Sequence, residues 1–138
     1  MEAIKEKKNK IVLSNYDLLY LDAGFGNRWG NNYSEFHTWN DIYYGFDPEV
    51  KDINGTIIGA EACLWSEINN EATQMEKMWM RGSALAERLW NPKANADPKK
   101  VVMDRVISFQ KNITFRGIHA APVTSEYCER NPMICFQD

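Results

Sequence analysis

One short stretch decides how this chain folds: Gly59-Ala60-Glu61-Ala62-Cys63-Leu64-Trp65-Ser66-Glu67. It is approached through residues 56–59, which are β-branched or apolar and follow the turn pair Asn54-Gly55. This pattern predicts a short buried strand that the chain enters through a tight turn.

Alternate residues of an extended chain point to opposite sides, which places four side chains of the stretch on one side: Glu61, Cys63, Trp65 and Glu67. A plain core strand would not carry two carboxylates and an indole on one face, because buried charge is costly without partners. Two interpretations stay open. Either Trp65 belongs to the core and Glu67 begins the next loop, or the strand end opens into a polar pocket with an aromatic wall.

The composition is that of one small globular domain. The 138 residues suffice for a hydrophobic core, with 44% hydrophobic and 25% charged residues. The formal net charge of -3 gives no electrostatic reason to expect nucleic acid or an anionic membrane as a partner. No apolar run approaches the roughly 20 residues of a membrane span, and residues 1–8 lack the apolar region of a signal peptide.

The cysteines favour a disulfide over a metal site. Cys128 and Cys135 lie close together in a loop-like tail without a nearby histidine, so we predict a bond between them. Cys63 is left over, and we interpret it as a buried free thiol. His37 and His119 are isolated, and we expect neither to be functional. We therefore expect no metal ion and no cofactor.

Three glycosylation sequons and the cysteine pair point to the secretory route. The sequons begin at Asn32, Asn54 and Asn112. Each alone is weak, since such triplets also arise by chance in a chain rich in asparagine. Together these features predict a lysosomal or extracellular protein.

Upstream of the deciding stretch, the pattern predicts little helix. Residues 2–9 resemble the end of one, and residues 10–15 form an apolar run typical of a buried parallel strand. Residues 16–48 have no helical period and are rich in glycine and aromatic residues, which predicts a long functional loop. Such loops suit sugars, because C–H faces stack on indole and phenol rings.

Downstream of the stretch, two helices are predicted. The first spans residues 71–90, with Asn69 or Asn70 as its N-cap. Its expected apolar stripe is Met75, Met78, Trp79, Leu85, Ala86, Leu89 and Trp90. The second runs from Pro98 to about residue 115 and ends at Gly117, and the tail after residue 122 is expected to be irregular. This β/α alternation indicates a mostly parallel sheet, and two such strands are too few to be stable alone.

Several motifs carry a family resemblance: residues 59–67, Trp79-Met80-Arg81, residues 84–90, residues 16–22 followed by Gly24-Phe25-Gly26, Trp39 with Tyr43 and Pro48, and Arg116-Gly117-Ile118. In this order, and over nearly the whole chain, they resemble the C-terminal part of family 20 β-N-acetylhexosaminidases. The resemblance implies an α/β fold that consists of the last two strands and helices of a (β/α)8 TIM barrel, which by themselves are an incomplete barrel. Residues 1–121 would form this barrel part, and residues 122–138 the tail.

The resemblance also implies the reaction. Family members hydrolyse terminal N-acetylglucosamine or N-acetylgalactosamine with retention, and the acetamido oxygen of the substrate is the nucleophile. An Asp-Glu pair on an earlier strand orients the acetamido group and protonates the leaving oxygen. This sequence contains no Asp-Glu dipeptide, so we expect the isolated chain to be inactive. An alternative is a non-catalytic fragment that binds sugar or a partner, and another is a piece that does not fold.

Four residues match the receiving half of the family site. Tyr20 matches the tyrosine whose hydroxyl stabilises the oxazolinium-like intermediate. Asp22 matches a position that binds a sugar hydroxyl, Trp65 a wall around the N-acetyl group and ring, and Glu67 the carboxylate that accepts bonds from ring hydroxyls. An N-acetylhexosaminide is thus the implied ligand, and a dimer of the complete enzyme is an implied possibility.

Other motif positions suggest structural roles or departures. Four charged residues are expected to make structural ion pairs: Glu61, Arg81, Glu87 and Arg88. Met80 stands where the family usually has proline, which predicts a straighter helix or a later helix start. Lys111 stands near the position of a cysteine in animal relatives.

Overall fold

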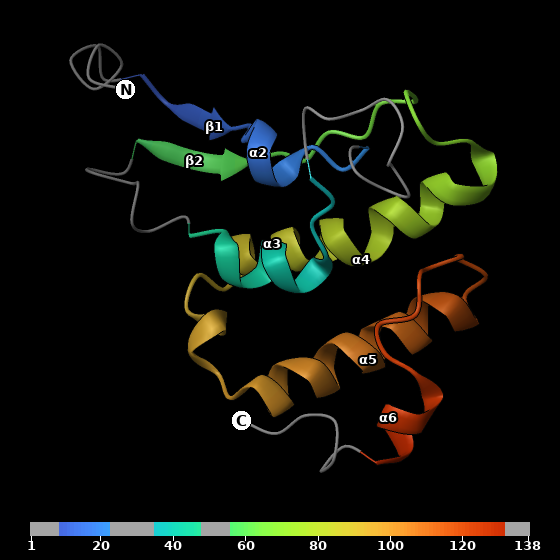
Figure 1. Cartoon of the computed structure of the whole chain (residues 1–138). Helices are drawn as coiled ribbons and strands as arrows, with labels where there is room; N and C mark the ends of the chain where they lie inside the picture. Colours follow the sequence, from blue (N-terminus) through green and yellow to red (C-terminus); the bar gives the residue numbers. More distant parts are fainter. Residues whose placement is uncertain (1–8, 23–34, 48–55, 132–138) are drawn as a thin grey trace.

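The computed structural model describes residues 9–22, 35–47 and 56–131. Its elements in chain order are β1 (Ile11–Leu13), α2 (Tyr16–Leu19), α3 (Trp39–Gly45), β2 (Ile57–Ala60), α4 (Glu71–Trp90), the 3-10 helix η1 (Ala94–Ala96), α5 (Lys99–Phe115) and α6 (Glu126–Arg130). The strands and α2 form one layer, α3 and α4 the next, and α5 lies beyond them (Figure 1). No helix in these described ranges is both long and apolar enough to cross a membrane.

The two predicted strands are present and pair in parallel, which confirms the expected parallel sheet. Leu13 lies opposite Ala60, and beyond the strands Tyr20 forms an isolated parallel bridge with Cys63. One face of the pair is bare, because the side chains of Val12 and Ile58 remain 50% and 62% exposed. The pairing therefore carries two chain segments forward side by side, toward the residues that follow each strand.

The long loop predicted for residues 16–48 is wrong in its described part, which contains α2 and α3. Asn15 caps α2 through its side chain, and Thr38 caps α3 in a reciprocal capping box with Asp41. Ile42 and Tyr43 in α3 are completely buried, and α3 packs on α4. Both helices are too short for a helical period to be recognised, so their caps and tertiary contacts decide them.

Helix α4 has the predicted bounds, and Asn70 is its N-cap. It runs unbroken through Met80, in agreement with the straighter helix expected without proline. Its buried face was predicted only in part: Leu85 alone of the expected stripe is fully buried, while Trp79 and Leu89 are partly buried and pack against the core. The residues that are buried are Lys77, Met80, Arg81, Ala84, Leu85 and Arg88. Three of these residues are cations. A prediction from hydropathy assigns cations to the exposed face, so it places the buried face of α4 at the wrong angle around the helix axis.

The end of α5 is also as predicted. Gly117 has φ +85, and the Ile118 N–H donates to the carbonyl of Ile113 while the Gly117 N–H donates to that of Thr114. These two bonds form a Schellman motif, which needs a residue that tolerates the left-handed region. The irregular tail was predicted wrongly, because Ser125 caps the short helix α6.

Three sequence predictions have a different outcome or none. Cys63 is free, as expected, but is half-buried rather than buried. Cys128 lies in α6, and Cys135 lies outside the described residues, so the disulfide stays a prediction. The helix end predicted for residues 2–9 falls almost wholly outside the described ranges.

Candidate functional site

Two of the predicted site residues meet where the paired segments continue past the strands. The Tyr20 hydroxyl donates to Glu67 Oε2 at 2.7 Å. The bridge between Tyr20 and Cys63 explains this meeting, because it aligns the two segments: Leu21 N–H donates to the Cys63 carbonyl and Cys63 N–H to that of Leu19. Tyr20 is half-buried, Glu67 is exposed, and the ring of Tyr16 stacks on that of Tyr20 at 5.6 Å between centroids.

Asp22, the third predicted residue, is completely buried beneath this pair. Its Oδ2 accepts the backbone N–H of Glu67 at 2.6 Å and that of Ile68 at 3.3 Å. Its Oδ1 accepts a bond from the Asn69 side-chain amide. Asp22 therefore fixes the backbone from which Glu67 projects, and a sugar hydroxyl could reach its carboxylate only if one of these contacts opened.

Lys77 also holds the backbone around Asp22 in place, and the sequence analysis did not identify it. Its Nζ donates to the carbonyls of Asp22 at 3.0 Å and Ile68 at 3.1 Å, and it lies 3.5 Å from Asp22 Oδ1. The side chains of the Lys77–Asp22 ion pair are both 0% exposed. One ammonium group on α4 thus ties together the segments that follow both strands.

The pKa values of this buried pair follow from its surroundings. Burial by itself raises the pKa of the Asp22 carboxyl. Hydrogen bonds from the Asn69 amide and from two backbone N–H groups outweigh that effect, with help from the Lys77 charge, so the pKa lies below its ordinary value. Burial lowers the pKa of Lys77, and the neighbouring carboxylate of Asp22 offsets part of this. The pair is held in its charged form by contacts on both sides.

Arg81, one turn further along α4, anchors the same region through carbonyl groups. Its Nε donates to the Lys77 carbonyl at 2.8 Å, and its guanidinium also donates to the carbonyls of Leu21 and His37. The guanidinium lies over the Phe36 ring, 4.8 Å from the centroid, and burial lowers its pKa to about 10. Arg81 therefore joins the end of the Tyr20–Asp22 segment to the start of α3.

Trp65, the fourth predicted residue, is joined to the others only through its backbone. Its side chain is 66% exposed, which rules out the interpretation of Trp65 as a core residue in this structure. Its carbonyl accepts a bond of 2.6 Å from the same Asn69 amide that binds Asp22. Asn69 thus shapes the turn between Trp65 and Glu67, and leaves the indole free to approach a ligand from solvent.

The expected structural ion pairs are present for one residue of the predicted set. Glu87 pairs with Arg105 at 2.8 Å, and both bind the hydroxyl of Tyr43, whose pKa burial raises to about 12. Arg88 is completely buried and donates to the carbonyls of Phe46, Asn91 and Pro92. Within the described ranges Arg81 and Arg88 bind carbonyl oxygens and form no ion pair.

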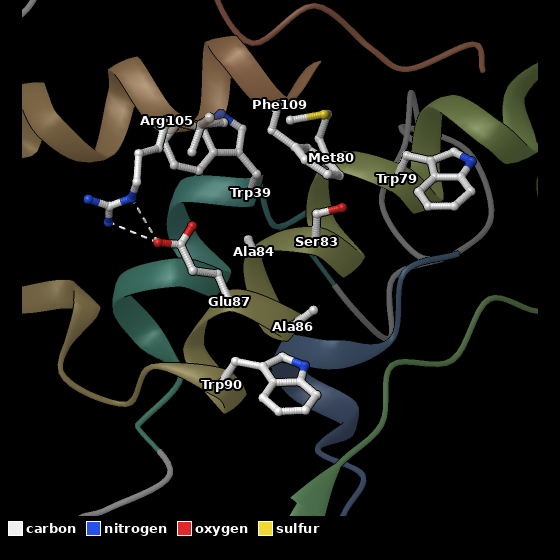
Figure 2. Close-up of a pocket in the computed structure, with 11 residues that line it drawn as sticks. Trp39, Trp79, Met80, Ser83, Ala84, Ala86, Glu87, Trp90, Arg105 and Phe109 are labelled. Carbon is white, nitrogen blue, oxygen red and sulfur yellow. Dashed lines mark hydrogen bonds and ion pairs between the residues drawn. The ribbon is translucent and has the colours of Figure 1, made fainter. Parts of the chain in front are cut away.

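A cavity of about 480 Å³ lies elsewhere, between α4 and α5. Figure 2 shows its lining, which includes Trp39, Met80 and Phe109, with the Glu87–Arg105 ion pair at one side. None of the four predicted site residues contributes to it. Its lining residues belong to α3, α4 and α5, and none comes from the strands or from the segments that follow them, so its apolar wall is separate from the Tyr20–Glu67 pair.

Among the described residues, no group of three or more histidine, cysteine or acidic side chains could hold a metal ion. The side chains of the candidate site can form hydrogen bonds and can stack on a ring. Tyr20 supplies a hydroxyl donor, Glu67 an exposed carboxylate acceptor, and Trp65 an exposed aromatic face. These groups suit a neutral, polyhydroxylated ligand with an apolar face.

Comparison with known proteins adds independent information. The model of the glycosyl hydrolase family 20 catalytic domain matches residues 1–93. The chain is 32% identical over 144 residues to a chitooligosaccharidolytic beta-N-acetylglucosaminidase of Bombyx mori, which covers 99% of this chain and 23% of the relative. It is 31% identical to beta-hexosaminidase 1 of Coccidioides posadasii, over 91% of this chain and 26% of the relative. It is 30% identical to beta-hexosaminidase subunit alpha of Mus musculus, over 75% and 19%. The chain thus spans about a quarter or less of the length of these curated relatives.

Proposed function

Because this chain belongs to glycosyl hydrolase family 20, we propose that it forms the sugar-binding and intermediate-stabilising half of a β-N-acetylhexosaminidase site. The whole protein would release terminal N-acetylglucosamine or N-acetylgalactosamine from glycoconjugates. The observation that carries the proposal is the 2.7 Å hydrogen bond from Tyr20 to Glu67 at the end of the paired segments. It brings together the hydroxyl that we propose as the donor to the acetamido group and the carboxylate that we propose as the acceptor from a ring hydroxyl.

The proposed role of Tyr20 follows from the substrate-assisted reaction. The acetamido oxygen attacks C1, the glycosidic bond breaks, and the leaving oxygen takes a proton from an acid outside this sequence. Positive charge then spreads over the oxazolinium-like ring, which water opens in the second step. A hydroxyl that donates to the acetamido oxygen holds this oxygen in line with C1 for attack, so Tyr20 would act by positioning the nucleophile.

In the structure without ligand, Glu67 occupies the donor of Tyr20. We propose that substrate exchanges this contact for two others, with Tyr20 donating to the acetamido oxygen and Glu67 accepting from a ring hydroxyl, chiefly the 4-hydroxyl. Trp65 would close over the sugar face. Asp22 would bind a hydroxyl only by releasing one of its present contacts, so its support of the Glu67 backbone is part of its proposed role.

The proposal also concerns the place of this chain in the fold of the complete protein. We propose that residues 1–121 are the C-terminal part of a (β/α)8 barrel and that residues 122–138 form its tail. Each strand is followed by a helix that packs on the next layer, and Val12 and Ile58 leave one sheet face uncovered. In a barrel that face would point inward and be covered by the other strands. A secretory location and a dimer of the complete enzyme remain parts of this proposal.

The proposal is tested by titrating the 138-residue chain with N-acetylglucosamine and following saturation transfer to the acetamido methyl by NMR. We expect the chain to bind N-acetylglucosamine but not to hydrolyse a chromogenic N-acetylglucosaminide, because its sequence contains no Asp-Glu dipeptide. Trp65→Phe and Glu67→Gln should each weaken binding about tenfold, the loss expected when a contact of about 1.4 kcal/mol is removed. Trp90→Phe is the matched control, since Trp90 is 90% exposed at the far end of α4.

Binding that is unchanged in the Trp65 and Glu67 variants would remove both residues from the site. Clear hydrolysis of a chromogenic N-acetylglucosaminide by the isolated chain would contradict its expected inactivity. The alternative of a non-catalytic sugar-binding fragment makes the same prediction for binding. It differs in expecting no gain of hydrolysis when the chain is part of a complete family 20 barrel.

A further inference from the structure

The last turns of α5 carry an acceptor for a modification that the proposed sugar site does not involve. Asn112, Ile113 and Thr114 form the sequon that lies in the described part of the chain. Asn112 is exposed, and no contact in this part engages its side-chain amide. Thr114 Oγ1 accepts a bond from the Gln110 amide at 3.1 Å, which leaves the hydroxyl proton of Thr114 able to donate.

Two exposed aromatic rings flank Asn112 on the surface of the helix. Phe109 precedes it by three residues and is 41% exposed, and Phe115 follows it by three residues and is 92% exposed. Residues three apart on a helix are surface neighbours, so both rings lie within one turn of the Asn112 side chain. A pyranose has an apolar C–H face that stacks on such rings. The Phe115 ring is available for this contact, because very little of the chain packs against it.

We propose that Asn112 carries an N-linked glycan whose first N-acetylglucosamine covers the Phe115 ring. In the transfer step Asn112 Nδ2 forms a bond to C1 of an oligosaccharide carried on a lipid diphosphate. The C1–O bond of that donor breaks, the lipid diphosphate leaves with the bonding electrons, and the amide nitrogen loses one proton. No oxidant or reductant is needed.

The local fold accommodates a glycan at this position. Ile113 is the buried residue of the triplet and faces the core, so the neighbouring Asn112 is directed outward. The Schellman motif at Gly117 ends the helix just after the sequon without using the Asn112 side chain. In Figure 1, α5 is separated from the strands by the layer of α3 and α4, so the glycan would not obstruct the Tyr20–Glu67 pair.

This inference rests on the secretory location that is part of the proposed function. Its test uses the chain expressed behind a heterologous secretion leader in a eukaryotic host, in a background with Asn32→Gln and Asn54→Gln that removes the other sequons. Peptide mass spectrometry on chain recovered from medium and endoplasmic reticulum then reads position 112. We expect a glycan on Asn112, retained in Thr114→Ser and lost in Thr114→Ala and Asn112→Gln.

An unmodified Asn112 in chain recovered from the secretory pathway would overturn the inference, and so would a glycan retained in Thr114→Ala. This readout is a peptide mass and does not depend on sugar binding at Tyr20 and Glu67. Failure of the N-acetylglucosamine titration would therefore leave it intact. Conversely, an unmodified Asn112 would not affect the titration.

The contact with Phe115 has its own test. Endoglycosidase H leaves the first N-acetylglucosamine on Asn112, whereas peptide N-glycosidase removes it and leaves aspartate. We expect Tm to be unchanged by the first enzyme and lowered by about 3 °C by the second, the shift of a contact worth a fraction of a kcal/mol to 1 kcal/mol in a chain of this size. In Phe115→Ala the difference should vanish except for the new charge.

Trp90→Ala is the matched control for that experiment, because the Trp90 side chain is 90% exposed, as exposed as Phe115, and lies on another helix, at the end of α4. It should preserve the full difference between the two enzymes. An equal difference in the wild-type chain and in Phe115→Ala would show that the glycan does not use the Phe115 ring.

Discussion

At the scale of single residues, the pair of Lys77 and Asp22 explains how the candidate site keeps its shape. Both side chains are completely buried, and together they bind backbone groups from the segments that follow each strand. A buried ion pair adds little net stability by itself, but the loss of one partner leaves an uncompensated charge. The pair therefore matters more for the position of Glu67 than for the total stability.

Lys77→Met should lower the free energy of unfolding by about 3–5 kcal/mol, because it leaves the buried Asp22 carboxylate without its cationic partner. The double variant Asp22→Asn with Lys77→Met should recover part of this loss, since the charges of both partners are then removed together. Urea unfolding followed by circular dichroism measures both. Additive losses in the double variant would contradict the coupling of the two residues.

The free energy of unfolding should depend on pH through the titration of the Asp22 carboxylate. Its pKa is lower in the folded chain than its ordinary value of about 4, so folding favours the charged form. Its contribution is complete above about pH 4 and is lost as the pH falls through the lower folded value. Unfolding measured from pH 6 to pH 2 should show this loss, and Asp22→Asn should show a shallower one. Equal slopes would exclude Asp22 as its source.

Tyr20→Phe in the complete enzyme should lower kcat by about 10²-fold with a smaller effect on KM, because the acetamido oxygen is then no longer held in position for attack on C1. Glu67→Gln should instead act mainly on KM, because it binds a hydroxyl that does not react. Steady-state kinetics on a chromogenic N-acetylglucosaminide separates the two. Tyr127→Phe is the control for loss of an exposed tyrosine hydroxyl, and a kcat unchanged in Tyr20→Phe would remove Tyr20 from its role.

At the scale of elements, the helices follow their end signals more faithfully than their hydropathy. Asn70 and Gly117 mark the start of α4 and the stop of α5, and both were recognised in the sequence. The buried face of α4 was recognised only in part, because Lys77, Arg81 and Arg88 lie on it. Each of the three also binds a carbonyl group distant in sequence (Asp22, Leu21 and Phe46 respectively), and no local pattern predicts these contacts.

Two glycines should respond in opposite directions to alanine. Gly117→Ala should destabilise the chain by about 1–2 kcal/mol, because φ +85 is strained for a residue with a Cβ. Gly82→Ala should stabilise it by up to about 1 kcal/mol, since Gly82 lies inside α4 and an added Cβ meets nothing within 4 Å. Thermal unfolding of the two variants side by side checks the pair. Destabilisation by Gly82→Ala would contradict the open space beside it.

At the scale of the whole molecule, the uncovered face of the strand pair is the feature that separates an isolated chain from part of a barrel. Val12 and Ile58 are the exposed apolar residues on it. A two-stranded sheet with a bare apolar face invites association with another apolar surface. In the proposed barrel the same residues would be interior.

Val12→Thr with Ile58→Thr should therefore reduce self-association of the 138-residue chain, measured by light scattering, and change its unfolding free energy by less than about 0.5 kcal/mol. In the complete protein the same substitutions should cost about 1–3 kcal/mol, because the side chains would be buried there. Val101→Thr on α5 is the control, at 45% exposure. Equal effects in both proteins would contradict the barrel proposal.

The sequence by itself determined the parallel strands, the two long helices with their ends, and the family, because these depend on local periodicity, capping residues and contiguous motifs. Only the tertiary structure decided which face of α4 is buried, that α2 and α3 are helical, and that Asp22 lies beneath Glu67 while Trp65 faces solvent. The reason is physical: a buried charge or a short helix is stable only through partners that lie far along the chain, and sequence spacing does not record them.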